Sequence, residues 1–312
     1  MGYYDREYLR GVALSTAVLL LPTLSVGVAW LFFFSPLPLI YFPIAHGFDK
    51  GFRIIFHATL ISVGIALLTG TLPVLLFSLS LMPAGFIVAR SLSRKQSIFD
   101  AFSHGSIALG LTWLAGGVLL GGVNHVNLYQ EVLKQIDAGL LGAYETYSKT
   151  PEIPLEMQAE LQTAFTRIRE ITPKVFPGVL VTITFSTIWL NIMLANWLLK
   201  KTGAPAWGDL SQWRLPEYLV WVFIGAGIFL FIPGAMSTLG LNLMIIMVTL
   251  YFMQGFEVFN HLCRRWAVPD TIRVLGLFFL VIQAYGFILL ALLGLADIWA
   301  DFRKPKKIET QT

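Results

Sequence analysis

Long apolar runs separated by short polar connections restrict the fold of this sequence more than any other feature. Eight stretches are apolar over the roughly 20 residues that a helix needs to cross a bilayer: residues 9–29, 53–70, 72–90, 100–122, 175–199, 217–235, 238–262 and 272–297. Of the 312 residues, 56% are hydrophobic and only 13% charged. Because a soluble core of this size cannot bury so much apolar surface, we predict an all-α, polytopic integral membrane helical bundle.

A ninth apolar stretch, residues 31–45, is too short to be a regular span. It contains three prolines, Pro36, Pro38 and Pro43. Proline lacks the backbone N–H that forms a hydrogen bond in a helix interior. The stretch is therefore expected to be a broken or re-entrant element, sheltered from lipid by protein or water.

A glycine-flanked turn follows the proline-broken element. Gly47 and Gly51 enclose Asp49 and Lys50, and residues without a Cβ allow two backbones to approach closely. Since transporters often bind ligands where a membrane helix is interrupted, this bend is a candidate functional site. A tight cytoplasmic turn with one exposed ion pair explains the same residues.

Basic residues indicate how the chain is oriented. Lys and Arg gather on alternate connections, which predicts five cytoplasmic segments, at residues 6–10, 50–53, 90–95, 200–214 and 264–273. Nine crossings would place the basic tail at residues 303–307 outside the cytoplasm, against the same rule. Either the tail is external or one element does not cross fully.

The largest polar stretch, residues 122–172, contains seven acidic and four basic residues. Apolar residues recur at helical spacing over 129–140 and 157–171, on either side of the punctuated segment 150–154. We predict an extracytoplasmic hairpin of two amphipathic helices, which caps the membrane domain, lies in the headgroup layer or packs only on itself. The predicted domains are thus membrane helices at 1–122 and 174–302, the hairpin at 123–173 and a polar tail at 303–312.

Polar residues inside the predicted spans are the other candidates for function, because they usually face a cavity or a partner. Gln254, Glu257 and His261 share one helical face, so Glu257 could contact His261 or extend to the cytoplasmic rim. Such a pair is either structural or part of a proton relay. The amide of Asn191 either bonds across helices or lines a pocket. Together with the bend, these observations predict seven ligand-binding residues: His46, Asp49, Lys50, His57, Asn191, Glu257 and His261.

The sequence contains none of the usual motifs for ATP hydrolysis, zinc proteolysis or serine esterase chemistry. The five histidines stand far apart, and the single cysteine, Cys263, permits no internal disulfide. We therefore predict that the protein is not an enzyme and has no catalytic residues, metal site or cofactor. Its net charge of +4 comes without a basic stripe, which excludes nucleic acid as a partner.

Several tryptophans lie near the ends of the predicted spans. Five of the nine are expected to act as membrane-interface anchors rather than as a binding cage: Trp30, Trp207, Trp213, Trp266 and Trp299.

Several segments in a fixed order, among them FFFSPLPLIYFPIAHG, NWLLKKTG, LGLNLMIIMVTLYFMQG and the ending LLGLADIWADFRK, resemble the YybS-like family of predicted bacterial membrane proteins. The resemblance covers nearly the whole chain and implies a location in the bacterial inner membrane. In addition, PLPLIYFP followed by HGFDKGF is similar to the second and third helices of the substrate-binding subunits of energy-coupling-factor vitamin transporters. That likeness implies ligand binding among helices, with ATPase and coupling subunits supplied by other chains.

These observations predict a transporter-like ligand-binding or permeation module without its own ATPase. The cavity is expected along the broken element and the polar faces of the spans at 175–199 and 217–235. A membrane scaffold or assembly factor that docks a partner is the alternative. Beyond the lipid bilayer, the expected partners are separate energising or envelope subunits.

Overall fold

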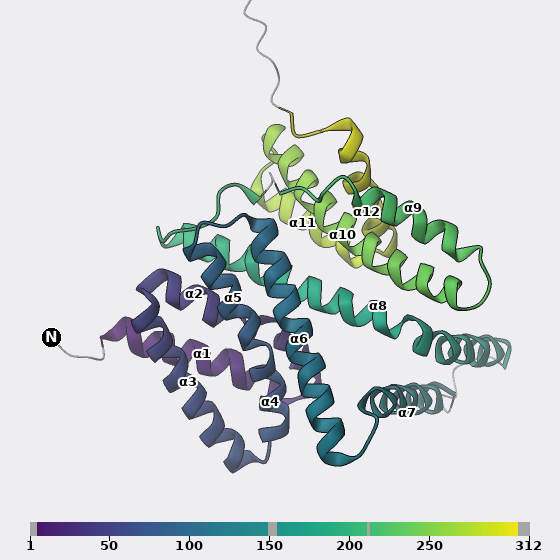
Figure 1. The fold of residues 1–312 in the computed structure, drawn as a ribbon, viewed down its shortest axis with the longest axis horizontal. Coiled ribbons are helices and arrows are strands. Elements are labelled where there is room, and N and C mark those ends of the chain that lie inside the picture. The colour runs from purple at the N-terminus through teal and green to yellow at the C-terminus, as the bar shows by residue number, and fades with distance from the viewer. Residues whose placement is uncertain (1–4, 149–154, 211–212, 305–312) are drawn as a thin grey trace, which may run out of the picture. The chain divides into compact units, whose positions relative to one another are not determined.

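The computed structural model describes residues 5–148, 155–210 and 213–304, and the regular structure in these residues is helical throughout (Figure 1). The all-α prediction is therefore confirmed for the described residues. The helices in chain order are α1 (Arg6–Leu24), the 3-10 helix η1 (Val26–Phe34), α2 (Leu37–His46), α3 (Phe48–Thr69), α4 (Leu72–Ser80), α5 (Met82–Ser93), α6 (Ile98–Asn124), α7 (Leu128–Ser148), α8 (Leu155–Lys201), α9 (Leu219–Leu230), α10 (Ala235–Arg265), α11 (Asp270–Ile282) and α12 (Ala284–Ala300).

Within the described residues, five helical segments are long and apolar enough to cross a membrane: Phe48–Thr69, Leu72–Ser93, Ile98–Val123, Gln158–Lys201 and Ala235–Arg265. Two bent pairs, η1 with α2 and α11 with α12, raise the number to seven if each pair is one crossing. The eight predicted spans are not confirmed. Charged residues at the start of α1 shorten its apolar part, and α9 has only 12 residues.

The chain forms two compact units, and neither is one continuous stretch of sequence. Unit 1 comprises Met1–Thr112, Ile183–Val220 and Val248–Thr312. Unit 2 comprises Trp113–Thr182 and Trp221–Met247.

In unit 1, the proline-containing element is broken as predicted. The 3-10 helix η1 ends at Phe34 and α2 begins at Leu37, with a bend of 40° between them. The buried side chains of α2 include Leu39, Ile40 and Phe42. Because α2 packs against both α3 and α5, the element is sheltered by protein.

Glycines allow this close packing of α2. A Cβ at Gly51 of α3 would lie 2.4 Å from the backbone of Pro43, and a Cβ at Gly85 of α5 would lie 2.6 Å from the carbonyl oxygen of Pro36. Gly47 makes the turn between α2 and α3 at φ +84°. The predicted close approach of two backbones at this bend is therefore confirmed at Gly51.

The last predicted span, 272–297, is not one straight helix. The chain bends by 108° between α11 and α12, and Gly286 lies so near Leu280 that a Cβ would be 2.0 Å from its carbonyl oxygen. The guanidinium of Arg265, at the end of α10, donates to the carbonyl of Phe302 just beyond α12. Residues 270–300 thus fold back to the end of α10 from which they started.

This return bears on the side of the membrane where the tail lies, which stays a prediction. Arg303 donates to the carbonyl oxygen of Trp213, so the start of the tail lies beside the 202–218 connection, which the charge distribution assigns to the cytoplasm. Arg303 itself is buried. The remaining basic tail residues, Lys306 and Lys307, lie outside the described residues.

Unit 2 contains α7 and the first part of α8, which cover the residues of the predicted hairpin. α7 pairs with the first part of α8 through an ion pair between Arg169 and Asp137 and through edge-to-face contact of Tyr144 with Phe165. The hydrogen bond from Arg169 lowers the pKa of Asp137. The extracytoplasmic location of this pair stays a prediction, and the punctuated segment 150–154 lies outside the described residues.

The hairpin does not end where the sequence suggested. α8 runs without interruption from Leu155 to Lys201, through Pro173 and Pro177. The second amphipathic helix and the predicted span at 175–199 are therefore one helix. Near these prolines the amide of Asn242 on α10 accepts from the N–H of Gly178 (2.6 Å) and donates to the carbonyl oxygen of Lys174 (2.7 Å). The side chain thus bonds to backbone groups in the part of the helix that the prolines interrupt.

Candidate functional site

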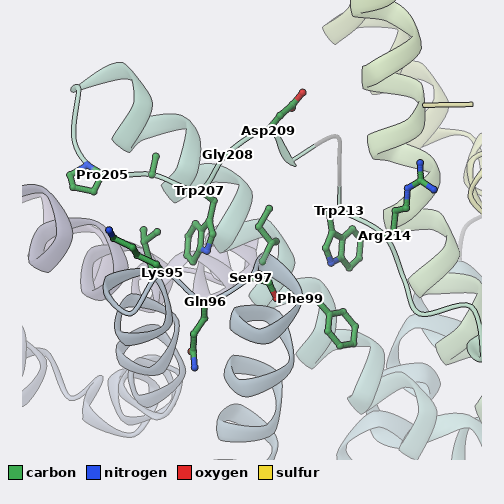
Figure 2. A pocket seen from close by; sticks show the side chains of 13 residues that line it. Lys95, Gln96, Ser97, Phe99, Pro205, Trp207, Gly208, Asp209, Trp213 and Arg214 are labelled. Atoms are coloured by element: carbon green, nitrogen blue, oxygen red, sulfur yellow. The ribbon is translucent and has the colours of Figure 1, made fainter. Parts of the chain in front are cut away.

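Unit 1 contains an open pocket of about 750 Å³ at the end where α5 stops and α6 starts (Figure 2). Residues 92 and 95–99 line one side, and residues 205–209, 213 and 214 of the connection between α8 and α9 line the other. We call it the tryptophan pocket, because Trp207 and Trp213 both face it. The connection has little regular structure, so side-chain contacts must hold it in place.

The two tryptophans are buried inside the protein. Trp207 and Trp213 are each only 5% exposed, and the ring of Trp213 packs edge-on against Phe102 with centroids 5.8 Å apart. The prediction that they anchor the membrane interface is therefore wrong. By contrast, Trp30, Trp266 and Trp299 are 58–69% exposed, which suits interface anchors.

Both indole N–H groups lack a hydrogen-bond partner among the described residues. Figure 2 shows Trp207 on the side of Lys95 and Trp213 on the side of Arg214. A buried donor without an acceptor costs about 1–3 kcal/mol. These two nitrogens are shielded from the open pocket, and the lining of the pocket is mostly apolar.

Charged side chains stand at the rim of the pocket. Arg214 forms an ion pair with Asp301, whose pKa is lowered by that hydrogen bond and by a second one from Lys304. Asp209 forms an ion pair with Arg264 at 3.0 Å. These pairs join the pocket rim to the ends of α10 and α12.

A buried polar network holds the wall of the pocket that carries Trp213. The amide of Gln254 on α10 accepts from the N–H of Leu215 (2.9 Å) and donates to the carbonyl oxygen of Gly294 (3.0 Å) and to the carboxylate of Asp297 (3.3 Å). Arg303 forms a salt bridge with Asp297 and donates to the carbonyl oxygen of Trp213 (2.6 Å). The network thus links α10, α12, the start of the tail and the irregular connection.

Sequence reasoning missed this network. Gln254 was recognised as a polar residue in a span, but Asp297 and Arg303 were not linked to it, because 43 and 49 residues separate them from Gln254. The signal that could have found them is the presence of two ionisable residues at the end of the final apolar run, since a charge at membrane depth usually has a partner.

Glu257 lies one turn after Gln254 and is only 3% exposed. Its side chain does not extend to the aqueous rim, so that alternative is wrong. One carboxylate oxygen has no hydrogen-bond partner among the described residues, and the charges that act on it are those of Arg264, Asp209, Arg303 and Lys200. Its predicted neighbour, His261, is partly buried and makes contacts of its own.

Four predicted ligand-binding residues belong to α2 and α3, outside the lining of the tryptophan pocket, and two of them contact the start of α1. Lys50 forms an ion pair with Asp5 at 2.8 Å, and Nδ1 of His57 lies 2.8 Å from the hydroxyl of Tyr8. His46 stacks on Phe42. Asp49 is exposed, and its carbonyl oxygen accepts from Arg53. These contacts give the bend a structural role.

Asp5 illustrates that role. Its carboxylate caps α1 by accepting from the N–H of Tyr8, and it also accepts from Lys50. The hydrogen bond from Lys50 and the backbone hydrogen bond lower the pKa of Asp5. The exposed ion pair predicted at the bend is therefore present at Lys50, but its partner is Asp5 rather than Asp49.

Asn191 connects α8 to the broken element. The side chain is fully buried, and its amide nitrogen donates to the carbonyl oxygens of Phe33 in η1 and of Thr187. It therefore satisfies a carbonyl of the irregular helix across elements, and its own oxygen has no partner among the described residues. This contact brings the broken element and the predicted fifth span together by direct packing.

No group of three or more His, Cys, Asp or Glu side chains in the described part of the chain is arranged to hold a metal ion.

A family model described as a predicted membrane protein, DUF2232, matches residues 12–298. The match covers most of the chain, as the resemblance based on the order of its apolar segments implies. No curated protein and no solved structure matches the chain. The likeness of its N-terminal part to vitamin-transporter subunits is not confirmed by these comparisons.

Proposed function

Since the chain belongs to the DUF2232 family of predicted membrane proteins, we propose that it is a multi-pass membrane module that binds a small ligand in the tryptophan pocket. The observation that carries this proposal is an open pocket of about 750 Å³ whose lining includes two buried tryptophans, Trp207 and Trp213, with charged residues at its rim. Pockets with a few convergent polar groups are typical ligand sites.

This location replaces the one expected at the broken element. There α2 is buried against its neighbours, and Gly51 and Gly85 bring backbones into contact, so close packing fills the space that a ligand would need. The buried network around Gln254, in contrast, fixes one wall of the tryptophan pocket in place. Pre-organised polar groups of this kind favour binding.

The protein should be tested as the full chain in detergent by measuring its melting temperature with vitamins and other small metabolites. A binding ligand should raise the melting temperature in a concentration-dependent manner. The rise should disappear when Trp207 and Trp213 are both replaced by Phe, and it should persist in the control Trp30→Phe/Trp266→Phe. A rise that survives loss of both pocket indoles would place the ligand elsewhere and contradict the proposal.

Within this proposal, transport remains the leading role. The chain would act in the bacterial inner membrane without hydrolysing ATP itself, and separate subunits would supply energy. Uptake of the identified ligand by proteoliposomes, with and without co-purified subunits, tests this step. Uptake with no dependence on the pocket residues would contradict the transport role.

A scaffold that docks a protein partner is the second candidate, and one observation favours it. The α7–α8 hairpin of unit 2 leaves several large apolar side chains exposed: Tyr129, Val132, Leu141, Ile168 and Ile171. Photo-crosslinkers placed at Val132 and Ile168 should capture a stoichiometric protein if the hairpin docks a partner. Crosslinking to lipid alone would instead support a position in the headgroup layer.

A further inference from the structure

Glu257 is a buried carboxyl group on α10 that does not line the tryptophan pocket. The helix that carries it is long and apolar enough to cross a membrane. Met253, about one turn before it, and Val258, next to it in sequence, are buried as well. An ionised carboxylate at such a position is costly unless a partner compensates its charge.

No compensating partner of Glu257 is found in the described part of the chain. One of its oxygens accepts no hydrogen bond, and the side chain forms no salt bridge with a described residue. His261, one turn later on α10, makes contacts of its own. The ammonium of Lys200, at the end of α8, donates to the carbonyl oxygen of Gly208 (2.7 Å). Lys200 therefore acts on Glu257 only from a distance.

The other charges that act on Glu257 are also engaged elsewhere. Arg264, two turns further along α10, forms an ion pair with Asp209 of the connection between α8 and α9 at 3.0 Å. Arg303, beyond the end of α12, forms a salt bridge with Asp297. Each positive charge thus faces an acid other than Glu257, and an ionised Glu257 would lack a counter-ion.

Asp297 shows what a compensated carboxylate looks like in the same unit. Its side chain is 1% exposed, but it forms a salt bridge with Arg303 and accepts from the amide of Gln254 (3.3 Å). Two buried carboxyl groups therefore have opposite surroundings, one with a cation and a donor and the other with neither. Surroundings that differ in this way give two carboxyl groups different protonation states and roles.

We propose that Glu257 is a reversible proton-binding site in the membrane part of unit 1. The carboxyl group carries a proton in the structure described, because the neutral acid needs no counter-ion in apolar surroundings. Arg264 marks the charged end of α10, so water at this end is the expected donor and acceptor of the proton. Buried ionisable residues in membrane spans often serve in proton relays. This inference goes beyond the proposed function and does not depend on a ligand in the tryptophan pocket.

Infrared spectroscopy of the full chain in an ester-free maltoside detergent tests the proposal. A protonated carboxyl group has a carbonyl band that is separate from those of amides and carboxylates. The unaltered chain should show this band at neutral pH, and the neutral isostere Glu257→Gln should lose it. Glu217→Gln makes the same change at an exposed carboxyl group of unit 1 and should keep the band. Glu257→Asp, which retains an acid, should shift the band rather than abolish it.

Reversibility is tested by changing the pH. The band should disappear as the pH is raised and return when the pH is lowered again. The melting temperature should respond as well, because a carboxyl group that keeps its proton only when buried weakens folding as protons become scarce. The melting temperature of the unaltered chain should therefore fall as the pH rises, and that of Glu257→Gln should fall less.

Three results would overturn the proposal. The unaltered chain lacks a protonated-carboxyl band, which needs no variant to establish. The band survives in Glu257→Gln and so belongs to another acid. The band persists at high pH in a chain that is still folded, which means that the proton does not exchange. None of these results changes the proposed function, which is tested separately through the tryptophans of the pocket.

Discussion

Replacing Arg303 by Met should destabilise the protein far more than its place near the end of the described chain suggests. The side chains of Arg303 and Asp297 are only 3% and 1% exposed, and together with Gln254 they form one hydrogen-bonded network. Removing one partner of a buried ion pair leaves an uncompensated charge and costs about 3–5 kcal/mol. The same change also frees the carbonyl oxygen of Trp213, which now accepts from Arg303.

The free energy of unfolding can be measured in mixed micelles by titration with a denaturing detergent. Asp297→Asn should show a similar loss, and the double variant Asp297→Asn/Arg303→Met should lose clearly less than the sum of the two, because neither charge is then left alone. Arg214→Met breaks the solvent-accessible pair with Asp301 and serves as the control. If Arg303→Met costs no more than Arg214→Met, or if the two single losses simply add, the buried network does not hold this end of the unit as described.

Three further predictions address the packing, the pH response and the topology. Gly255→Ala should prevent α10 and α12 from packing, because the new Cβ would lie 1.7 Å from the carbonyl oxygen of Leu290. Gly110→Ala is the control and should be tolerated, because its Cβ would meet nothing within 4 Å. The melting temperatures of the two variants test this difference. The pKa of Asp5 is lowered in the folded state, so the carboxylate stabilises the fold above its usual pKa of 3.8. This stabilisation is lost as the pH falls through the lower pKa of the folded state. In Asp5→Asn, the melting temperature should therefore fall less on acidification than in the unaltered chain. A reporter that is active only in the cytoplasm should work when fused after Thr312 and when inserted at Gly203, and opposite results at the two sites would contradict the placement of Arg303 beside Trp213.

The sequence predicted the local features of the fold well. Pro36, Pro38 and Pro43 correctly predicted the broken element, because a proline without an N–H disrupts the helix in which it lies. Gly51 likewise marked a close approach of two backbones, which the contact with Pro43 confirms. Both features depend on residues within one short segment, where sequence reasoning is strongest.

Features that depend on distant residues could not be predicted in this way. A run of apolar residues has the same composition whether it crosses the membrane or folds back, so residues 272–297 looked like a span although the chain bends near Gln283. The second helix of the predicted hairpin and the predicted span at 175–199 looked like separate elements, yet α8 joins them in one helix. A tryptophan near a predicted span end is typical of an interface anchor, and only tertiary packing shows that Trp207 and Trp213 are buried.

The irregular connection between α8 and α9 also determines which part of the tryptophan pocket is free to move. Its backbone is fastened at Gly208 by Lys200, at Trp213 by Arg303 and at Leu215 by Gln254. Outward movement of this connection would break the buried hydrogen bonds at Trp213 and Leu215. The connection is therefore poorly suited to open and close over the pocket.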